Sequence, residues 1–475
     1  MSEIKKTMYY SKDTKTIAAP FCDFVLSCLR NEKPDCTFIV DSVFNETISF
    51  SPLPEFEKRM FVDIVYSNRI ERLMTLIGSH RFSKHEVTII GLWTQKQISI
   101  LENVPQHIKI LGKQFIVDMS KKYQILWWSF AVLFSRNSRI ELSTDGKKAN
   151  LKTNVLGFGK DYVVSIDLDK IDEIGIANKR EFLRLIVKEK AKPALIVGNG
   201  VSIPFGSDNW SQTSSNLYDY LFPFYLSNPD KVKEIIGNTN YSITSLVKET
   251  LDKEAFSSAL WHCIYRKYSK NKMHNETTLV RSIIKAKYRN QEMPIFTYNY
   301  DNFLETDSSL IYPDFKIKSV YDNKCFQTIG EPRIVHLHGF LDFEKTKRTM
   351  SDVIITDADY YKNYRSSSWI VRAQKQLLKE HICLFVGSSM SDLYQMSLIH
   401  EVRSKHLKTT NEIEYMWKCF ALMCIKDLED KDKLSIINYY LRKGVYLIFT
   451  DSFLKLPTIL DEMLESIASS KKIVK

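Results

Sequence analysis

The pattern of apolar and polar positions changes near residue 190. Before it, short β-branched and aromatic runs alternate with turn-forming pieces between residues 36 and 112, and further runs follow at SRIELST, NVLGFG and YVVSIDL. This texture is typical of a mixed α/β or mainly β module. The most apolar window, YQILWWSFAVLF at residues 123–134, is well short of the ~18 apolar residues that span a membrane, so it predicts a buried core helix.

After residue 193 the apolar runs become short and nearly continuous. They lie at residues 194–198, 293–299, 334–339, 382–389, 419–425 and 444–450. Helical stretches are expected between them, for example at 227–236, 360–380 and 431–443. Buried strands that alternate with helices predict a parallel sheet covered on both faces. A helix-like stretch at 172–192 precedes this region, so we expect an N-terminal domain at residues 1–175 and a second α/β domain at 176–475.

The amino-acid composition says more about the expected binding partners than about the fold. Lys and Arg number 67 against 56 Asp and Glu, for a net charge of +11, but the excess is scattered along the chain. A solvated surface with a basic bias explains this better than a nucleic-acid interface, which is not indicated. Eight cysteines form no C-x-x-C pair, and the N-terminus lacks the apolar stretch of a signal peptide. We therefore expect a cytoplasmic protein with reduced thiols, no membrane span and no metal site.

Glycines follow the first strand of the second domain. In LIVGNGVSIPFGSDNW, at residues 195–210, an apolar run ends at Gly198 and Gly200 before a predicted helix. Glycines there allow backbone N–H groups to approach a phosphate, and a helix N-terminus adds partial positive charge. A tight turn between strand and helix without any ligand is the other interpretation, because the third glycine of the usual dinucleotide fingerprint is missing.

Two later strands end in residues that can do acid–base chemistry. IFTYNYDNFLE, at 295–305, delivers Asn299 and Asp301 at a carboxyl end, where open α/β sheets bind ligands. The alternative is that Asn299 turns the chain and Asp301 caps a helix that begins near residue 302. IVHLHGFLDF, at 334–343, ends in His336 and His338. A histidine can act as a general base towards a hydroxyl or water, or simply form a structural hydrogen bond.

A fourth strand end occurs in LFVGSSMSDLYQ, at residues 384–395. Ser388, Ser389 and Asp392 could hold ribose hydroxyls, or Asp392 could only cap the following helix. Four strand ends of this character in one domain favour a shared site at one edge of the sheet over four independent caps.

Together and in this order, the four motifs resemble the sirtuin superfamily, especially the sirtuin-like domains of prokaryotic anti-phage defence proteins. The resemblance covers roughly residues 190–465. It implies a Rossmann-like domain that binds NAD through residues Gly198, Asn199, Gly200, Val201, Ser202, Thr297, Gly387 and Ser389. Ser388 and Asp392 of the same strand end are expected to join them in binding NAD. By the same resemblance, Asn299 positions the nicotinamide ribose or a water, His338 acts as the base, and Asp301 organises the site. His336 stays an alternative to His338.

Departures from the family pattern refine the expected activity. The deacylases of this family carry a zinc ribbon with two C-x-x-C pairs, whereas only Cys325 and Cys383 lie between Asp301 and Gly387, and Tyr298 replaces the usual glutamine. The resemblance then implies an NAD+ hydrolase that releases nicotinamide, with NAD as substrate and no metal, acting in anti-phage defence through NAD depletion. The alternatives are a non-catalytic module that binds NAD or ADP-ribose, and a protein deacylase.

The N-terminal domain contains no motif that we can assign to chemistry. An unregulated NAD hydrolase would exhaust its own cell, so we hypothesise that residues 1–175 sense a phage-derived or protein trigger, with homo-oligomerisation as a plausible switch. The sequence leaves open the trigger, the oligomeric state and whether the product is ADP-ribose or its cyclic form.

Overall fold

The chain forms two compact units, each assembled from three stretches. The computed structural model describes residues 21–32, 38–44, 47–52, 60–134, 139–153, 162–188, 190–221, 225–237, 239–268, 278–326, 332–344, 353–409 and 418–472. Unit 1 comprises Met1–Ala177, His400–Trp417 and Leu428–Tyr446, and unit 2 comprises Asn178–Ile399, Lys418–Asp427 and Leu447–Lys475. The domain boundary expected between residues 175 and 176 stays a prediction.

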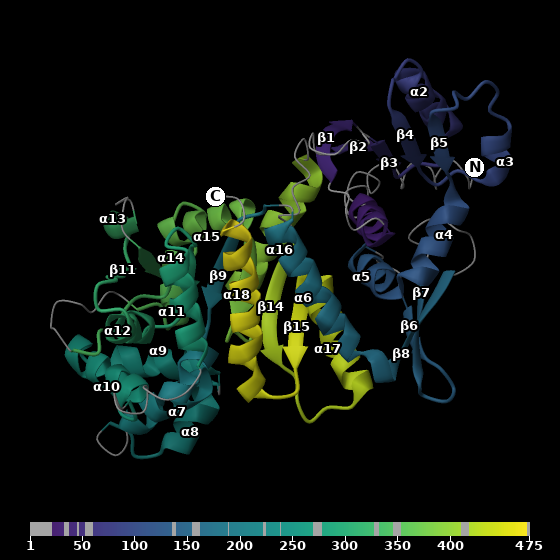
Figure 1. Ribbon diagram of the computed structural model, residues 1–475. Coiled ribbons are helices and arrows are strands. Elements are labelled where there is room, and N and C mark those ends of the chain that lie inside the picture. Colours follow the sequence, from purple (N-terminus) through teal and green to yellow (C-terminus); the bar gives the residue numbers. More distant parts are fainter. Residues whose placement is uncertain are drawn as a thin grey trace. The chain divides into compact units, whose positions relative to one another are not determined.

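Unit 1 contains two sheets (Figure 1). The larger has the order β1 (Phe38–Phe44), β2 (Thr47–Pro52), β3 (Met60–Val65), β4 (Glu86–Ile90), β5 (Ile108–Leu111). Its first two pairings are antiparallel and its last two parallel. The smaller sheet is antiparallel and consists of β6 (Arg139–Leu142), β7 (Lys148–Thr153) and β8 (Tyr162–Asp167). The mixed α/β character expected for the N-terminal region is confirmed, while the strand expected at 154–159 lies outside the described residues.

The helices of unit 1 bury the apolar residues that the sequence concentrates there. They include the helix at residues 21–32, α2 (Ile70–His80), α3 (Gln95–Ser99), α4 (Lys113–Lys122), α5 (Gln124–Phe134) and α17 (Asp430–Arg442). One core cluster forms between α2 and the sheet, from Val65, Leu73, Leu76, Val87, Ile89, Trp93 and Ile108. Within α5, Trp127 and Trp128 are fully buried, which confirms the core helix expected at 123–134. The Trp128 indole donates to Asn438 Oδ1 on α17 over 2.9 Å.

Unit 2 is built on a seven-stranded sheet. Its order is β11 (Lys318–Val320), β12 (Arg333–His336), β10 (Ile295–Thr297), β9 (Pro193–Val197), β13 (Ile382–Val386), β14 (Cys419–Cys424), β15 (Val445–Thr450). The pairings from β11 to β14 are parallel. Every residue of β9 and of β13 is buried, as expected for strands covered on both faces. The Rossmann-like parallel sheet predicted for this part of the chain is confirmed.

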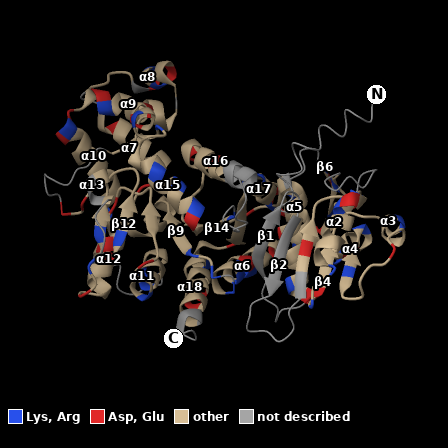
Figure 2. Cartoon of the chain, turned by 90° about the horizontal axis from the view of Figure 1, so that it is seen from above, with Lys and Arg blue, Asp and Glu red and all other residues tan. Residues whose placement is uncertain are grey.

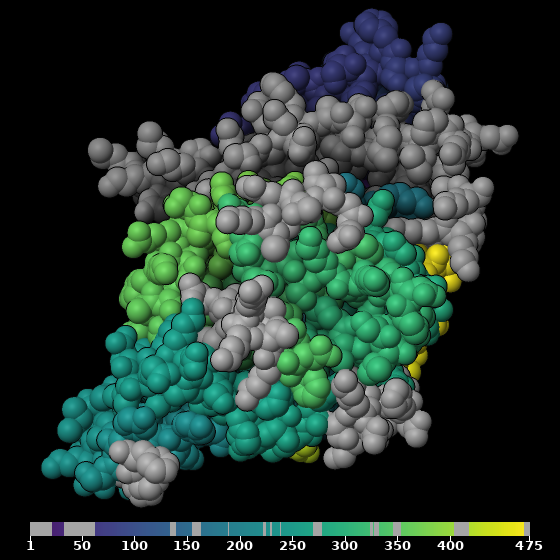
Figure 3. Space-filling view, turned by 90° about the vertical axis from the view of Figure 1, so that its left-hand side faces the viewer, coloured from purple at the N-terminus to yellow at the C-terminus, as the bar shows by residue number. Residues whose placement is uncertain are grey.

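Helices cover this sheet and also form an insert. The helices around the sheet are α6 (Asp172–Val187), α11 (Leu279–Arg289), α12 (Phe303–Ile311), α13 (Asn323–Phe326), α15 (Trp369–Glu380), α16 (Leu393–Thr409) and α18 (Leu456–Lys472). Between β9 and β10 the chain adds the insert, made of α7 (Trp210–Leu221), α8 (Pro229–Ile236), α9 (Asn240–Thr250) and α10 (Lys253–Tyr265), which is teal in Figure 1 and contributes the teal surface of Figure 3.

The prediction of one helix at residues 360–380 is wrong in one respect, because this stretch contains parts of two helices. α14 (Asp357–Asn363) ends at Tyr364, and α15 begins after Ser368, whose hydroxyl accepts a hydrogen bond from the Val371 N–H. An N-terminal serine cap starts a new helix because it satisfies an otherwise free backbone donor.

Charged residues of both signs are interspersed along the described elements (Figure 2). Among those elements, no helix combines the length and the apolar character needed to cross a bilayer.

Candidate functional site

Three loops meet where the strand order reverses. β9 lies at the centre of the sheet, with β10 on one side and β13 on the other. All three strands are parallel, so the loops that follow them leave the same edge. Parallel α/β sheets bind ligands at such a switch point, beyond the carboxyl ends of the strands. These loops carry Gly198, Asn299 and Gly387.

The glycines are explained by close contact between two of these loops. Gly200 N–H donates to Gly387 O over 2.7 Å. A Cβ at Gly198 or Gly200 would come within 2.7 or 2.8 Å of that same oxygen. Gly387 has a φ of +64°, and a Cβ there would lie 2.6 Å from Val201 N. All three positions therefore exclude side chains.

After Gly198 the chain does not enter the α-helix that the sequence suggested. Two short 3-10 turns follow, and α7 begins only at Trp210. In the first turn Val201 N–H donates to Gly198 O and Ser202 N–H to Asn199 O. The helix dipole expected to act directly after Gly200 is thus displaced, and the expected phosphate loop stays a prediction.

Asn299 is held by its neighbours through one end of its amide. Its Nδ2 donates to Gly198 O over 3.2 Å and to Ser202 Oγ over 2.9 Å. Its backbone N–H donates to Thr297 Oγ1 over 3.0 Å. Its Oδ1 is buried and has no hydrogen-bond partner within the described residues. A buried amide oxygen without a donor is unusual and needs an explanation.

Asp301 continues this hydrogen-bonded chain. Ser202 Oγ donates to Asp301 Oδ2 over 2.7 Å, and Phe303 N–H donates to Oδ1 over 3.2 Å. Asp301 is 6% exposed. Burial raises its pKa, the bonds from Ser202 and Phe303 oppose that rise, and the pKa lies at about 6. Asp301 thus accepts from the first N–H of α12, whose N-cap residue is Asn302, and it also contacts the glycine loop through Ser202.

His338 follows the neighbouring strand at the equivalent position. β10 and β12 pair Thr297 with His336, so Asn299 and His338 each lie two residues beyond that pair. His338 Nε2 lies 2.7 Å from Tyr364 Oη, in hydrogen-bond contact. Its ring packs edge-on against Tyr298, with the centroids 4.9 Å apart. Burial lowers the pKa of His338 to about 4, so the imidazole is neutral at pH 7.

His336 has a different environment from His338. Its Nδ1 lies 3.1 Å from Asn299 O, and its Nε2 lies 2.8 Å from Glu305 Oε1. Burial lowers its pKa, but the Glu305 carboxylate and the Asn299 carbonyl outweigh burial and raise it above the ordinary value. The contact from Nδ1 anchors the backbone of Asn299. Because both ring nitrogens already have partners, His336 is less suited than His338 to take a proton from a ligand.

The polar residues of the loop after β13 contact the start of α16, Tyr360 and one another. Asp392 Oδ1 accepts from the N–H groups of Tyr394 and Gln395 at the start of α16, so the capping role considered for Asp392 is present. Its Oδ2 accepts from Tyr360 Oη over 2.8 Å. Ser388 Oγ accepts from Met390 N–H, and the exposed Ser389 contacts Ser391. Contacts with ribose hydroxyls stay a prediction for all three.

The structure thus brings most of the expected site residues together. One connected group joins the glycine loop to Gly387, Thr297, Asn299 and Asp301, while Asn199 turns away, its Nδ2 donating to Asp208 O over 2.7 Å. A second group surrounds His338. This second group contains Tyr360 and Tyr364. Their role could not be inferred from the sequence, because they lie in a segment whose pattern predicts only a helix.

No group of three or more His, Cys, Asp or Glu side chains that could hold a metal occurs in the part of the chain that the structure describes.

Comparison with known protein families is consistent with this geometry. The family model of the SIR2-like domain matches residues 294–435, which supports a sirtuin-like superfamily for that part of the chain and indicates NAD-related activity in general. The matched stretch contains Asn299, Asp301, His338 and Gly387, whereas the glycine loop at 198–202 precedes it. No curated protein matches the chain.

Proposed function

We propose that this protein is an NAD+ glycohydrolase, which cleaves the bond between nicotinamide and ribose C1′ and releases nicotinamide and ADP-ribose. The match to the SIR2-like domain supports a site for NAD. The proposed catalytic residues are Asn299, His338 and Asp301.

The orphan oxygen of Asn299 is the observation that carries this proposal. Gly198 and Ser202 fix the amide through Nδ2, and the buried Oδ1 is left without a donor among the described residues. A ribose hydroxyl or an attacking water would supply that donor. Because a buried polar atom costs free energy until it is paired, the site gains from binding such a group.

Hydrolysis of this bond requires that the attacking water be positioned at C1′ and that one group accept a proton. Water adds its oxygen to C1′ as the C1′–N bond breaks, the bonding pair leaves with nicotinamide as a neutral molecule, and one proton of the water is released. The transition state resembles that of glycoside cleavage. A neutral His338 can accept the proton, and Asn299 orients the hydroxyl or water.

An NAD+ cleavage assay on purified full-length protein tests the assignment. We expect turnover by the wild type, a loss of roughly 10²–10⁴-fold in His338→Ala and a loss of roughly 10²–10³-fold in Asn299→Ala. His262→Ala, at an exposed position on α10, is the matched control and should retain full activity. Equal turnover in all variants would remove the site assignment.

The same assay separates the rival functions. Turnover that requires an acyl-lysine peptide would identify a deacylase. Tight binding of NAD or ADP-ribose with no turnover, even after addition of infected-cell extract, would favour a binding module, which the low pKa of His338 also favours because a weak base gives little driving force for proton transfer.

We further propose a role as an effector of anti-phage defence, in which NAD depletion follows activation by a phage-derived or protein trigger at the N-terminal region. This role rests on the resemblance of the four motifs to defence proteins. Survival of infected cultures that express wild type or His338→Ala tests it, since only an active enzyme should protect.

A further inference from the structure

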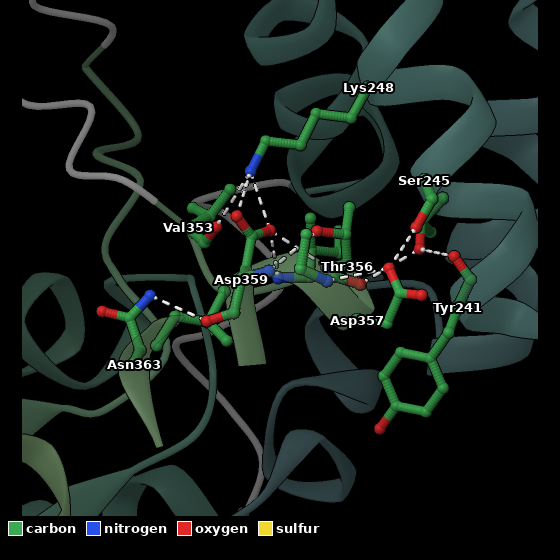
Figure 4. Close-up of polar contacts among 12 residues, drawn as sticks. Tyr241, Ser245, Lys248, Val353, Thr356, Asp357, Asp359 and Asn363 are labelled. Carbon is green, nitrogen blue, oxygen red and sulfur yellow. Dashed lines mark hydrogen bonds and ion pairs between the residues drawn. The ribbon is translucent and has the colours of Figure 1, made fainter. Parts of the chain in front are cut away.

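The segment that covers His338 is itself held by the helical insert. Residues 353–356 and α14 lie between α9 of the insert and the end of β12. Figure 4 shows the side of this segment that meets α9. The same segment carries the contacts to His338, so α14 links the insert to the proposed base.

Lys248 makes the central contact between α9 and α14 (Figure 4). Its Nζ lies 2.7 Å from both carboxylate oxygens of Asp359 and 3.5 Å from Val353 O. Beside it, Ser245 Oγ donates to Asp357 Oδ1 over 3.0 Å. Lys248 therefore bridges the segment before α14 and the helix itself.

Asp359 also sets where α14 begins. Its Oδ2 accepts from the N–H groups of Thr356 and Ile355, and Thr356 Oγ1 accepts from the N–H of Asp359. This reciprocal arrangement is a capping box, which fixes the first turn of a helix. The buried Thr244 Oγ1 donates to Ile355 O over 3.0 Å. One carboxylate thus joins the start of α14 to its docking on α9.

The same segment holds His338 at two points. Ile354 N–H donates to the His338 carbonyl over 2.8 Å, which fixes the backbone. Tyr364, directly after α14, contacts the imidazole Nε2 at 2.7 Å. Tyr360 packs edge-on against the same ring, with the centroids 5.3 Å apart. A displacement of α14 would therefore move the imidazole.

We propose that Lys248 is a positioning residue for His338, acting through its ion pair with Asp359 and the placement of α14. The link from Lys248 to the imidazole follows from the contacts alone, while its consequence for catalysis rests on the proposed function. The insert is then part of the active-site scaffold, since about 1 Å of misplacement of a catalytic group can cost about 10²-fold in rate.

Histidine NMR tests the link without any enzymatic activity. In full-length protein with ¹⁵N-labelled histidine, His338→Gln assigns the His338 imidazole signal by its loss. We expect Lys248→Met to shift or broaden that signal and Lys248→Arg to restore it. Lys285→Met is the matched control, because Lys285 is exposed to a similar degree and pairs with Glu465 on α18. It should leave the signal unchanged.

The outcomes of this NMR experiment are decisive in both directions. An unaltered His338 signal in Lys248→Met, or an equal change in Lys285→Met, would overturn the proposal. If Lys248→Met does not fold, Lys248→Gln, which keeps a donor on a shorter side chain, should give the same change at smaller size.

Kinetics test the consequence for catalysis. We expect Lys248→Met to lower kcat of NAD+ cleavage about 10- to 100-fold with little change in KM, and Lys248→Arg to recover most of it. In a Tyr364→Phe background the same substitution should have a smaller effect, because both act on one ring. Strict additivity would contradict the proposed route. Absence of turnover by the wild type would contradict the proposed function, whereas the NMR evidence for the link between Lys248 and His338 would not be affected.

Discussion

Asp301 has a carboxyl group whose environment opposes ionisation. Burial places its folded-state pKa at about 6, above the ordinary aspartate value of about 3.9. The folded protein therefore binds this proton more tightly than the unfolded chain does. Stability from this group is fully present below pH ~4, falls as pH rises to about 6, and is constant above that. The total is about 3 kcal/mol.

Comparison of wild type with Asp301→Asn isolates this contribution. We expect the difference in the free energy of unfolding between the two proteins to change by about 2 kcal/mol between pH 4 and pH 7, in favour of the variant at higher pH. Urea denaturation at several pH values measures it. A difference that does not vary with pH would show that Asp301 ionises normally.

At the same scale, the sequence predicted which polar residues meet but not what surrounds them. Asn299 and Asp301 are one strand alternation apart, and both contact Ser202 as a shared edge of the sheet requires. The partners of His338 could not be anticipated, because Tyr364 reaches it from a segment 26 residues later in the chain. No local periodicity reports such a contact.

Among the elements, α10 connects the insert to the loops of the site. Near its end Tyr265 Oη accepts from Asn302 N–H and lies within donating distance of Asn302 Oδ1 and Leu341 O. Tyr265 is 2% exposed. Its hydroxyl therefore satisfies buried polar groups after both β10 and β12.

Removal of this hydroxyl should destabilise the protein. We expect Tyr265→Phe to lower the free energy of unfolding by roughly 1–3 kcal/mol, because buried donors and acceptors lose their partner without room for water. Tyr220→Phe on α7, where the residue is 48% exposed, serves as the control and should change little. Chemical denaturation of wild type and both variants measures this effect. Equal stability of Tyr265→Phe and wild type would contradict the role assigned to the hydroxyl.

Helices and strands were predictable where the apolar pattern in the sequence was local and continuous. The continuous apolar runs of β9 and β13 predicted buried strands. β7 was missed although Ala149, Leu151 and Thr153 alternate with more exposed residues, and β11 is only three residues long. The break between α14 and α15 had a signal in Ser368, a serine directly before an apolar run.

For the whole molecule, the chain returns to unit 1 after it has entered unit 2. Residues 428–446, which include α17, belong to unit 1 with α5. A chain that starts at residue 176 would leave Asn438 without Trp128, so inactivity of such a fragment would carry little information. The hypothesis that the N-terminal region senses a trigger is better tested in the complete protein.

Extract from infected cells provides that test. If the N-terminal region responds to a trigger, NAD+ turnover by full-length protein should rise on the order of 5- to 150-fold over that in extract from uninfected cells, the usual range of coupling between sites. Extract with His338→Ala controls for NAD+ consumption by the host. Equal turnover in both extracts would contradict the regulatory role.

The central place of β9 in the sheet has a consequence for synthesis of the chain. Synthesis of β9 ends at Val197 and that of its neighbour β13 begins only at Ile382, and the glycine loop gains its contact with Gly387 only after β13 is made. A nascent or prematurely terminated polypeptide that stops before this residue lacks the loop after β13 on one side of β9. The proposed NAD+ cleavage is therefore expected to begin only after residue 387 has been synthesised.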